Sequence, residues 1–183
     1  MRRADLRINV IGTSGAGRTT LAARLGERLA VPHVELDALN WGPDWTERPP
    51  EDFRADLAAF IAQDAWVLCG NYTRIRPMLM ERANVIVWLD YPRWLVTWRV
   101  LCRSVERAWT GRELWAGNRE SFRLTFFSRD SIIWWSIKTF GKNRRKYRAM
   151  FEELAGRSDV QAVRLRAPRE AERWLTDIKP AER

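Results

Sequence analysis

Three glycines, an arginine and a threonine near the start of the chain have the spacing of a segment that holds phosphate groups. In the pattern G-x-x-x-x-G-K-[ST], Gly12, Gly17 and Thr19 occupy the required places, and Arg18 stands where lysine is usual. Glycine lets the backbone curl so that successive N–H groups point inward at an anion. The helical pattern that follows directs a positive dipole end at the same anion. The sequence therefore predicts that phosphates bind at Gly12, Thr13, Ser14, Gly15, Ala16, Gly17, Arg18, Thr19 and Thr20.

Two side chains of this loop have chemistry of their own. The hydroxyl of Thr19 follows the phosphate-reading residue, which is the place of a magnesium ligand in such loops. Arg18 must do the task of lysine, and it keeps a permanent positive charge and several donors. Its planar group is larger and less able to follow a moving phosphoryl group, so the exchange is not conservative. We therefore expect ATP and Mg²⁺ to bind, and turnover stays open.

Polar residues follow three of the apolar runs. Asp37 comes after the second run, where it would accept a proton from a hydroxyl or hold water on magnesium, unless it only caps a turn. The third run ends in Cys69, a poor magnesium ligand, and Asn71 and Tyr72 follow it as readers of polar substrate groups. The fourth run ends at Asp90, for which helix capping and a site role are equally open.

The positive charge is concentrated in one part of the chain. The net charge is +9, and residues 91–150 hold 14 lysines and arginines against 4 acids, whereas the rest holds 18 against 19. Arg99, Arg103 and Arg107 recur every four residues and make one basic helix face. Such a patch favours an anion, which would be nucleotide phosphates, a phosphorylated substrate or nucleic acid, with a merely solvated face as the alternative. Residues from about 108 to 130 interrupt the pattern and predict either an insertion or a mobile lid over the nucleotide.

Apolar runs and helical patterns alternate along the chain, which is typical of an α/β fold with a parallel sheet. The five predicted strands are Leu6–Ile11, Val34–Leu36, Trp66–Cys69, Val85–Leu89 and Val160–Leu165. Helices are predicted after the phosphate loop, from Pro50, after Pro92, over about 131–154 and after Pro168. Residues 1–183 read as one domain without a membrane span, and unpaired cysteines beside a phosphate loop favour the cytoplasm.

Eleven tryptophans are many for this length. Trp94 and Trp98 lie four residues apart in a helical pattern, a spacing typical of the core. Trp134 and Trp135 resemble buried or interface residues.

Taken in this order, the motifs resemble those of adenylate-kinase-like nucleoside and nucleotide kinases, and more closely those of the bacterial topology modulation proteins. The likeness is carried by residues 12–20, 36–41, 69–72, 88–92 and 112–120. It implies a three-layer α/β fold with a parallel five-stranded sheet in the order 2-3-1-4-5, a phosphate loop and a helical lid.

The resemblance also implies roles for single residues. Arg99 falls where an arginine packs on adenine, and Arg103 falls where one contacts phosphates. Asp37 matches the base or substrate-binding aspartate of the sugar and nucleoside kinases. Cys69 departs from the aspartate of this superfamily, and Arg74 is one place away from the arginine with which adenylate kinases bind a substrate phosphate. A nucleoside monophosphate is therefore not the obvious acceptor.

The sequence thus predicts a kinase that transfers phosphate from Mg-ATP to an unidentified small molecule. The alternatives are a nucleotide-dependent protein associated with nucleic acid and a nucleotide-binding protein without catalysis. No membrane partner is expected, and the oligomeric state stays open. The predicted catalytic residues are Arg18, Asp37 and Arg103; the acceptor residues are Asp37, Trp41, Asn71 and Tyr72; the magnesium ligand is Thr19; and Arg99 and Arg103 join the loop in binding the nucleotide.

Overall fold

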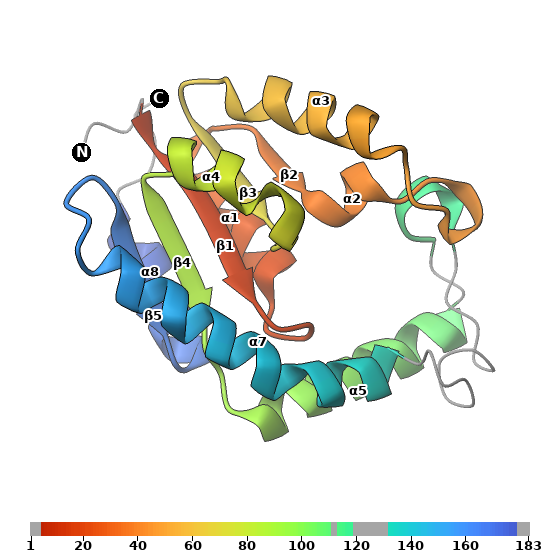
Figure 1. Ribbon diagram of the computed structural model, residues 1–183. Coiled ribbons are helices and arrows are strands. Elements are labelled where there is room, and N and C mark those ends of the chain that lie inside the picture. The colour runs from red at the N-terminus through yellow and green to blue at the C-terminus, as the bar shows by residue number, and fades with distance from the viewer. Residues whose placement is uncertain (1–4, 111–112, 119–131, 179–183) are drawn as a thin grey trace.

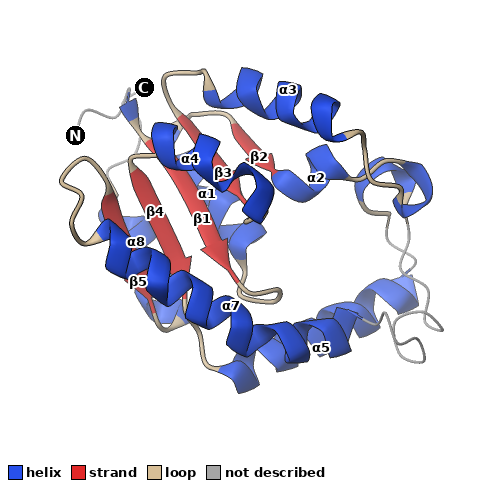
Figure 2. Cartoon of the chain, viewed as in Figure 1, coloured by secondary structure: helices blue, strands red, loops and turns tan. Residues whose placement is uncertain are grey.

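The strands form one parallel sheet, as predicted. The computed structural model describes residues 5–110, 113–118 and 132–178. Its sheet has the order β2-β3-β1-β4-β5, with every neighbouring pair parallel (Figures 1 and 2). The strands are β1 (Arg7–Gly12), β2 (His33–Glu35), β3 (Trp66–Cys69), β4 (Val85–Leu89) and β5 (Gln161–Leu165). The predicted segments are confirmed to within a residue at each end.

Helices cover both faces of this sheet (Figure 2). They are α1 (Arg18–Leu29), α2 (Leu36–Asn40), α3 (Pro50–Ile61), α4 (Arg76–Arg82), α5 (Arg93–Thr110), α7 (Ile132–Leu154) and α8 (Pro168–Asp177). Three short 3-10 turns are η2 (Pro43–Trp45), η3 (Thr73–Ile75) and η4 (Trp115–Gly117). None of the helices within the described ranges is long and apolar enough to cross a membrane.

The alternation of strand side chains builds two cores. In β4, Val85, Val87 and Leu89 join a core with α1 and α8, whereas Ile86 and Trp88 join a second core with α3, α4 and the C-terminal half of α7. Successive side chains of a strand point to opposite faces, so a continuous apolar run is covered on both sides. The result is the three-layer arrangement that the sequence predicts.

Two short helices were not predicted, and one of them changes the setting of Asp37. The second strand ends at Glu35, and Asp37 lies in the first turn of α2, not at a strand end. A five-residue helix is too short for its periodicity to be read from sequence. An acid in a first turn also interacts favourably with the helix dipole. The other unpredicted helix, α4, begins at Arg76 and has Pro77 in its first turn, where proline is favoured.

The prediction that Trp94 and Trp98 belong to the core is wrong. Their exposed fractions are 71% and 60%, and the buried residues of α5 include Val96, Val100 and Ser104 instead. Trp134 and Trp135 are also exposed. Of the two alternatives predicted for them, burial is therefore wrong, and a role in an interface stays a prediction. Spacing identifies a helix face, but it does not say which face turns inward.

A buried carboxylate fastens α7 to the sheet. Asp90, directly after β4, accepts hydrogen bonds from Arg144 of α7 at 2.7 Å and from Arg164 of β5 at 3.0 Å. Asp90 is 4% exposed, and the Arg164 guanidinium lies 4.4 Å from the centre of the Trp88 ring. The carboxylate therefore joins three elements, a structural role beyond the two that the sequence left open.

We expect Asp90→Asn to lower the free energy of unfolding by about 2–3 kcal/mol, because it leaves two arginines without their counter-charge; their partial exposure keeps the loss below that of a fully buried pair. Urea denaturation followed by far-UV circular dichroism measures the change. Asp159→Asn is the control, since Asp159 pairs with Arg157 at the exposed surface and its loss should matter little. Equal stability of wild type and Asp90→Asn would contradict this role.

Candidate functional site

The segment between β1 and α1 has the backbone of an anion-binding loop. Gly15 and Gly17 have φ values of +83° and +91°, which L side chains rarely adopt. The Ala16 amide donates to the Thr13 carbonyl at 3.1 Å and closes a turn, and α1 begins at Arg18. The first amides of a helix have no partner within it, so they are available to an anion in front of α1. The loop is therefore shaped for phosphate, as predicted.

Close contact with α5 brings two arginines to this loop. A Cβ on Gly15 would lie 2.6 Å from Val100 Cγ2 and 2.7 Å from the Val96 carbonyl oxygen, so only glycine lets α5 approach. Arg103 donates to the Ser14 hydroxyl at 3.1 Å. Arg99 lies with its guanidinium 5.6 Å from the centre of the Tyr91 ring, and its Nη1 is 3.6 Å from where a Cβ of Gly17 would stand. Both predicted arginines thus stand at the loop.

Arg18 is half-buried and faces the ends of the strands. Its charge lowers the pKa of Cys69, of Tyr72 and of Tyr147, in each case against a larger rise caused by burial. These groups belong to β3, the turn after it and α7. The charge of Arg18 therefore acts on three groups that stay neutral.

The hydroxyl predicted to bind magnesium has a carboxylate beside it that the sequence analysis missed. Thr19 Oγ1 donates to Glu35 Oε2 at 3.1 Å and lies 3.8 Å from Cys69 Sγ. Burial raises the pKa of the Cys69 thiol to about 11, so this thiol is neutral at physiological pH and is a poor ligand for a hard cation.

Strand register explains how Glu35 reaches this place. Glu35 of β2 pairs directly with Cys69 of β3 in the parallel ladder. The carboxylate that is lacking at the end of β3 is therefore supplied one strand further out. The available signal was the position of Glu35, two residues before Asp37 at the end of an apolar run.

A hydroxyl, an alkyl carboxylate and nucleotide phosphates together make an ordinary magnesium site, since Mg²⁺ keeps several waters and takes one or two carboxylates. The described part of the chain contains no cluster of three or more histidine, cysteine, aspartate or glutamate side chains that could hold a metal by itself. Thr19 and Glu35 therefore fit a metal that arrives with a nucleotide.

A second group of polar side chains lies around Asp37. The Tyr72 hydroxyl donates to Asp37 Oδ1 at 2.7 Å, and burial, followed by the charge of Asp37, raises the pKa of Tyr72, so this hydroxyl keeps its proton. Arg74 donates to the Asn40 side chain and lies 5.4 Å from the centre of the Tyr72 ring. The structure thus brings Asp37 and Tyr72 together and adds Arg74, which had only been noted as one place away from a family position.

The side chains of the other two predicted acceptor residues make other contacts, although the Trp41 amide donates to the Asp37 carbonyl at 3.1 Å. Asn71 lowers the pKa of Tyr147 against the larger rise caused by burial, and the Tyr147 hydroxyl donates to the Gly12 carbonyl at 3.2 Å, so Asn71 lies on the loop side of the site. Trp41 is half-buried and packs edge-on against Trp45, with 5.9 Å between ring centres.

Most of the predicted lid, 108–130, lies outside the described residues. Of it, α5 extends to Thr110, and residues 113–118 lie against the turn that follows α2. The Asn118 amide joins the two segments, because it accepts from the Trp45 amide at 2.9 Å and donates to the Gly42 carbonyl at 2.8 Å. Residues 113–118 of the predicted lid are thus held against α2 and the turn that follows it.

A known protein is similar in sequence over part of this chain. No protein-family profile matches the chain. The uncharacterized protein YqaC of Bacillus subtilis (strain 168) is 28% identical over 112 residues, which are 60% of this chain, and the match spans 62% of that protein's length.

Solved structures are similar over nearly the whole chain. A gluconokinase from Sinorhizobium meliloti 1021 has a TM-score of 0.52 at 20% identity and covers 97% of this chain and 95% of its own. Shikimate kinase from Acinetobacter baumannii, in complex with shikimate, has a TM-score of 0.56 at 14% identity, over 94% and 90% of the two chains. Shikimate kinase from Bacteroides thetaiotaomicron has a TM-score of 0.53 at 15% identity, over 94% and 95%. With its strand order and its phosphate loop, the chain has the fold of the P-loop kinases.

Proposed function

We propose that the chain is a kinase that transfers the terminal phosphoryl group of Mg-ATP to a hydroxyl of a small molecule. The observation that carries the proposal is the adjacency of two carboxylates to the phosphate loop: Glu35 is hydrogen-bonded to Thr19, and Asp37 follows two residues later beside Tyr72. Glu35 would help to hold the metal, and Asp37 would act on the acceptor.

The side of the site that would bind ATP, formed by the phosphate loop and α5, carries positive charge. Loop amides and Arg18 bind the phosphates, and Arg99 and Arg103 add two positive charges from α5. Positive groups fixed around a phosphoryl group stabilise the charge that spreads over its oxygens during transfer. Thr19 and Glu35 would hold magnesium, which would neutralise charge between the terminal phosphates.

The residues around Asp37 would bind the acceptor and take a proton from it. Asp37 accepts the proton of the attacking hydroxyl, and Tyr72, which stays protonated, fixes the orientation of the carboxylate through its 2.7 Å hydrogen bond. Arg74 is engaged with Asn40 and with Glu47, so its charge stabilises the wall of the site. These groups favour an acceptor that carries hydroxyls; a closer relation to the topology modulation proteins and a place in the cytoplasm are part of the same proposal.

Glu35→Gln should raise the magnesium concentration needed for half-maximal ATP hydrolysis or transfer roughly tenfold, because it keeps the hydrogen bond of Thr19 but removes a charged metal partner. Titration of Mg²⁺ at fixed ATP measures the change. Glu27→Gln is the matched control, since Glu27 is an exposed carboxylate of α1. An unchanged magnesium requirement in Glu35→Gln would contradict the role of Glu35.

Asp37→Asn should preserve ATP affinity and slow transfer by about 10²–10⁴-fold, the usual contribution of a positioned general base. A screen of polyols and hydroxy acids, with ADP release as readout, identifies the acceptor, and calorimetry gives the ATP affinity. Tyr72→Phe keeps the carboxylate and should cost far less. A wild-type transfer rate in Asp37→Asn would mean that this aspartate only supports α2.

Arg18→Ala should weaken ATP binding about ten- to hundredfold, since a charge-assisted contact contributes on the order of 1.5–3 kcal/mol. Arg18→Lys should retain binding. Arg24→Ala is the control on the same helix, because Arg24 pairs with Glu172 at the surface. If all four proteins bind ATP equally well, the phosphate-loop role of Arg18 is wrong.

A further inference from the structure

Arg74 is held in one orientation by four side chains from other parts of the chain. Its Nη2 donates to Asn40 Oδ1, and its Nη1 lies 3.4 Å from Glu47 Oε2. Its guanidinium lies 4.8 Å from the centre of the Phe53 ring and 5.4 Å from the centre of the Tyr72 ring. Stacking on rings and bonding through a planar fork are properties of arginine that lysine does not share. Because Glu47 supplies the counter-charge, the charge of Arg74 does not require an anionic group on a substrate.

The buried Asn40 indicates that its bond with Arg74 is needed. Its exposed fraction is 0%, and its Nδ2 has no hydrogen-bond partner among the described residues. A buried donor without a partner costs free energy, and an apolar side chain of similar size would avoid this cost. What asparagine adds is the Oδ1 atom that accepts from Arg74. The contact with Arg74 therefore explains the polar residue, and packing does not.

The short helix that carries Asp37 depends on such contacts. Helix α2 has five residues, and a helix of this length is not stable by itself. Tyr72 fastens the start of α2 through its hydrogen bond with Asp37, and Arg74 fastens the last residue, Asn40. The Tyr72 ring links the two contacts, because it lies beside Arg74 and carries the hydroxyl that holds Asp37. The position of the Asp37 carboxylate thus depends on Arg74 by two routes.

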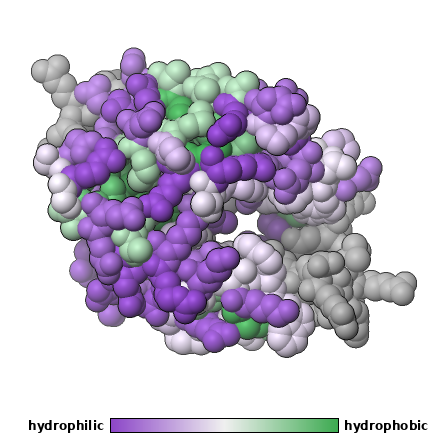
Figure 3. Space-filling model, viewed as in Figure 1, coloured by the Kyte–Doolittle hydropathy of each residue, from purple (hydrophilic) through white to green (hydrophobic). Residues whose placement is uncertain are grey.

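These residues lie where an acceptor would reach the site. Helix α2 is at the rim of a hollow in the molecular surface, and hydrophilic residues gather around this hollow (Figure 3). Burial and the charge of Asp37 raise the pKa of Tyr72, and the charges of Arg18 and Arg74 lower it by less. The pair of Tyr72 and Asp37 is therefore within reach of the charge at the phosphate loop and of the charge of Arg74.

We infer that Arg74 is a positioning residue for Asp37: it holds the Tyr72 ring and the end of α2, and thereby fixes the carboxylate that takes the proton of the acceptor. The effect on rate rests on the proposed phosphoryl transfer, whereas the effect on α2 does not. Arg74 itself makes no contact with the acceptor. Its role thus differs from that of the arginine, one place away, with which adenylate kinases bind a substrate phosphate.

Hydrogen exchange tests the effect on α2 without an acceptor. The Trp41 amide donates to the Asp37 carbonyl oxygen at 3.1 Å, so its exchange rate reports whether α2 is intact. Arg74→Lys and Arg74→Gln should both raise this rate about tenfold in NMR of the ¹⁵N-labelled protein, because both lose the stacked fork. The amides of β1 should exchange as in wild type. Glu47→Gln removes one exposed partner of Arg74 and should give a smaller rise, which keeps the test open if the Arg74 variants do not fold.

Kinetics separate positioning from binding. With the acceptor that the screen identifies, Arg74→Lys should lower kcat roughly tenfold and leave the KM of the acceptor within about twofold, because the carboxylate is misplaced and no binding group is lost. In the background of Asp37→Asn, the same change should have little further effect, since Arg74 acts through Asp37.

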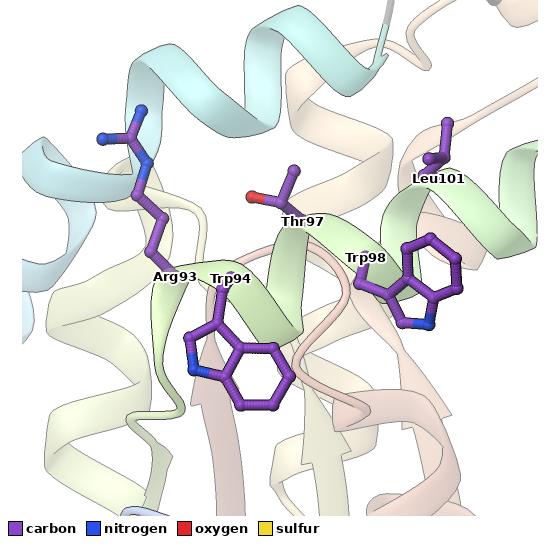
Figure 4. Close-up of a pocket in the computed structure, with 5 residues that line it drawn as sticks. All are labelled: Arg93, Trp94, Thr97, Trp98 and Leu101. Atoms are coloured by element: carbon purple, nitrogen blue, oxygen red, sulfur yellow. The ribbon is translucent and has the colours of Figure 1, made fainter.

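Arg93 provides the matched control. It also joins two elements, because its side chain extends from α5 toward α7 and donates to the Ile137 carbonyl at 3.4 Å (Figure 4). Arg93→Lys should leave kcat, KM and the exchange of the Trp41 amide as in wild type.

Four results would overturn the inference. In the Arg74 variants, these are unchanged exchange at Trp41, equal acceleration of the β1 amides, a raised KM with unchanged kcat, and full additivity with Asp37→Asn. The second would make Arg74 a residue of general stability, and the third would make it a residue that binds the acceptor. If the wild-type protein transfers phosphate to no acceptor, the proposed function fails, and exchange at Trp41 alone decides whether Arg74 holds α2.

Discussion

The close approach of α5 to the loop after β1, which only a glycine at position 15 allows, is the constraint on which the rest of this structure depends. The loop after β1 supplies amides, but the charges come from Arg18 and from the helix that Gly15 allows to approach. Once Arg99 and Arg103 turn inward, α5 must place its other side chains outward, because a helix has only one inward face. The exposed tryptophans are therefore a consequence of the way in which α5 meets the loop after β1.

On the proposed function, the register of β2 and β3 explains how Cys69 can stand where the kinases that the sequence resembles have an acid. A metal beside nucleotide phosphates needs a carboxylate in a certain place, and it does not matter which strand provides it. Because β2 and β3 are in parallel register, Glu35 stands next to Cys69 and reaches the Thr19 hydroxyl. The buried thiol stays neutral, so it adds no competing charge next to Arg18.

Segments that are far apart in the chain meet around α2 and the turn that follows it. Asp37 of α2 and Tyr72 of the turn after β3 share a hydrogen bond, and Asn118 ties residues 113–118 to the turn at Gly42. On the opposite side, Asp90 binds α7 to β4 and β5 through two arginines. The site is thus framed by side-chain contacts between elements, and the sheet provides the fixed edge from which they are positioned.

The sequence by itself determined the parts that depend on local pattern. The glycine spacing identified the phosphate loop, and the short apolar runs located the five strands, because both signals lie within a few residues. The strand order followed from resemblance. Tertiary structure alone decided that Glu35 reaches Thr19, that Arg74 approaches Tyr72, that Asp90 is an anchor, and that Trp94 faces outward. Each of these depends on register between strands or on the rotation of a helix about its axis, and these are fixed only when distant segments pack together.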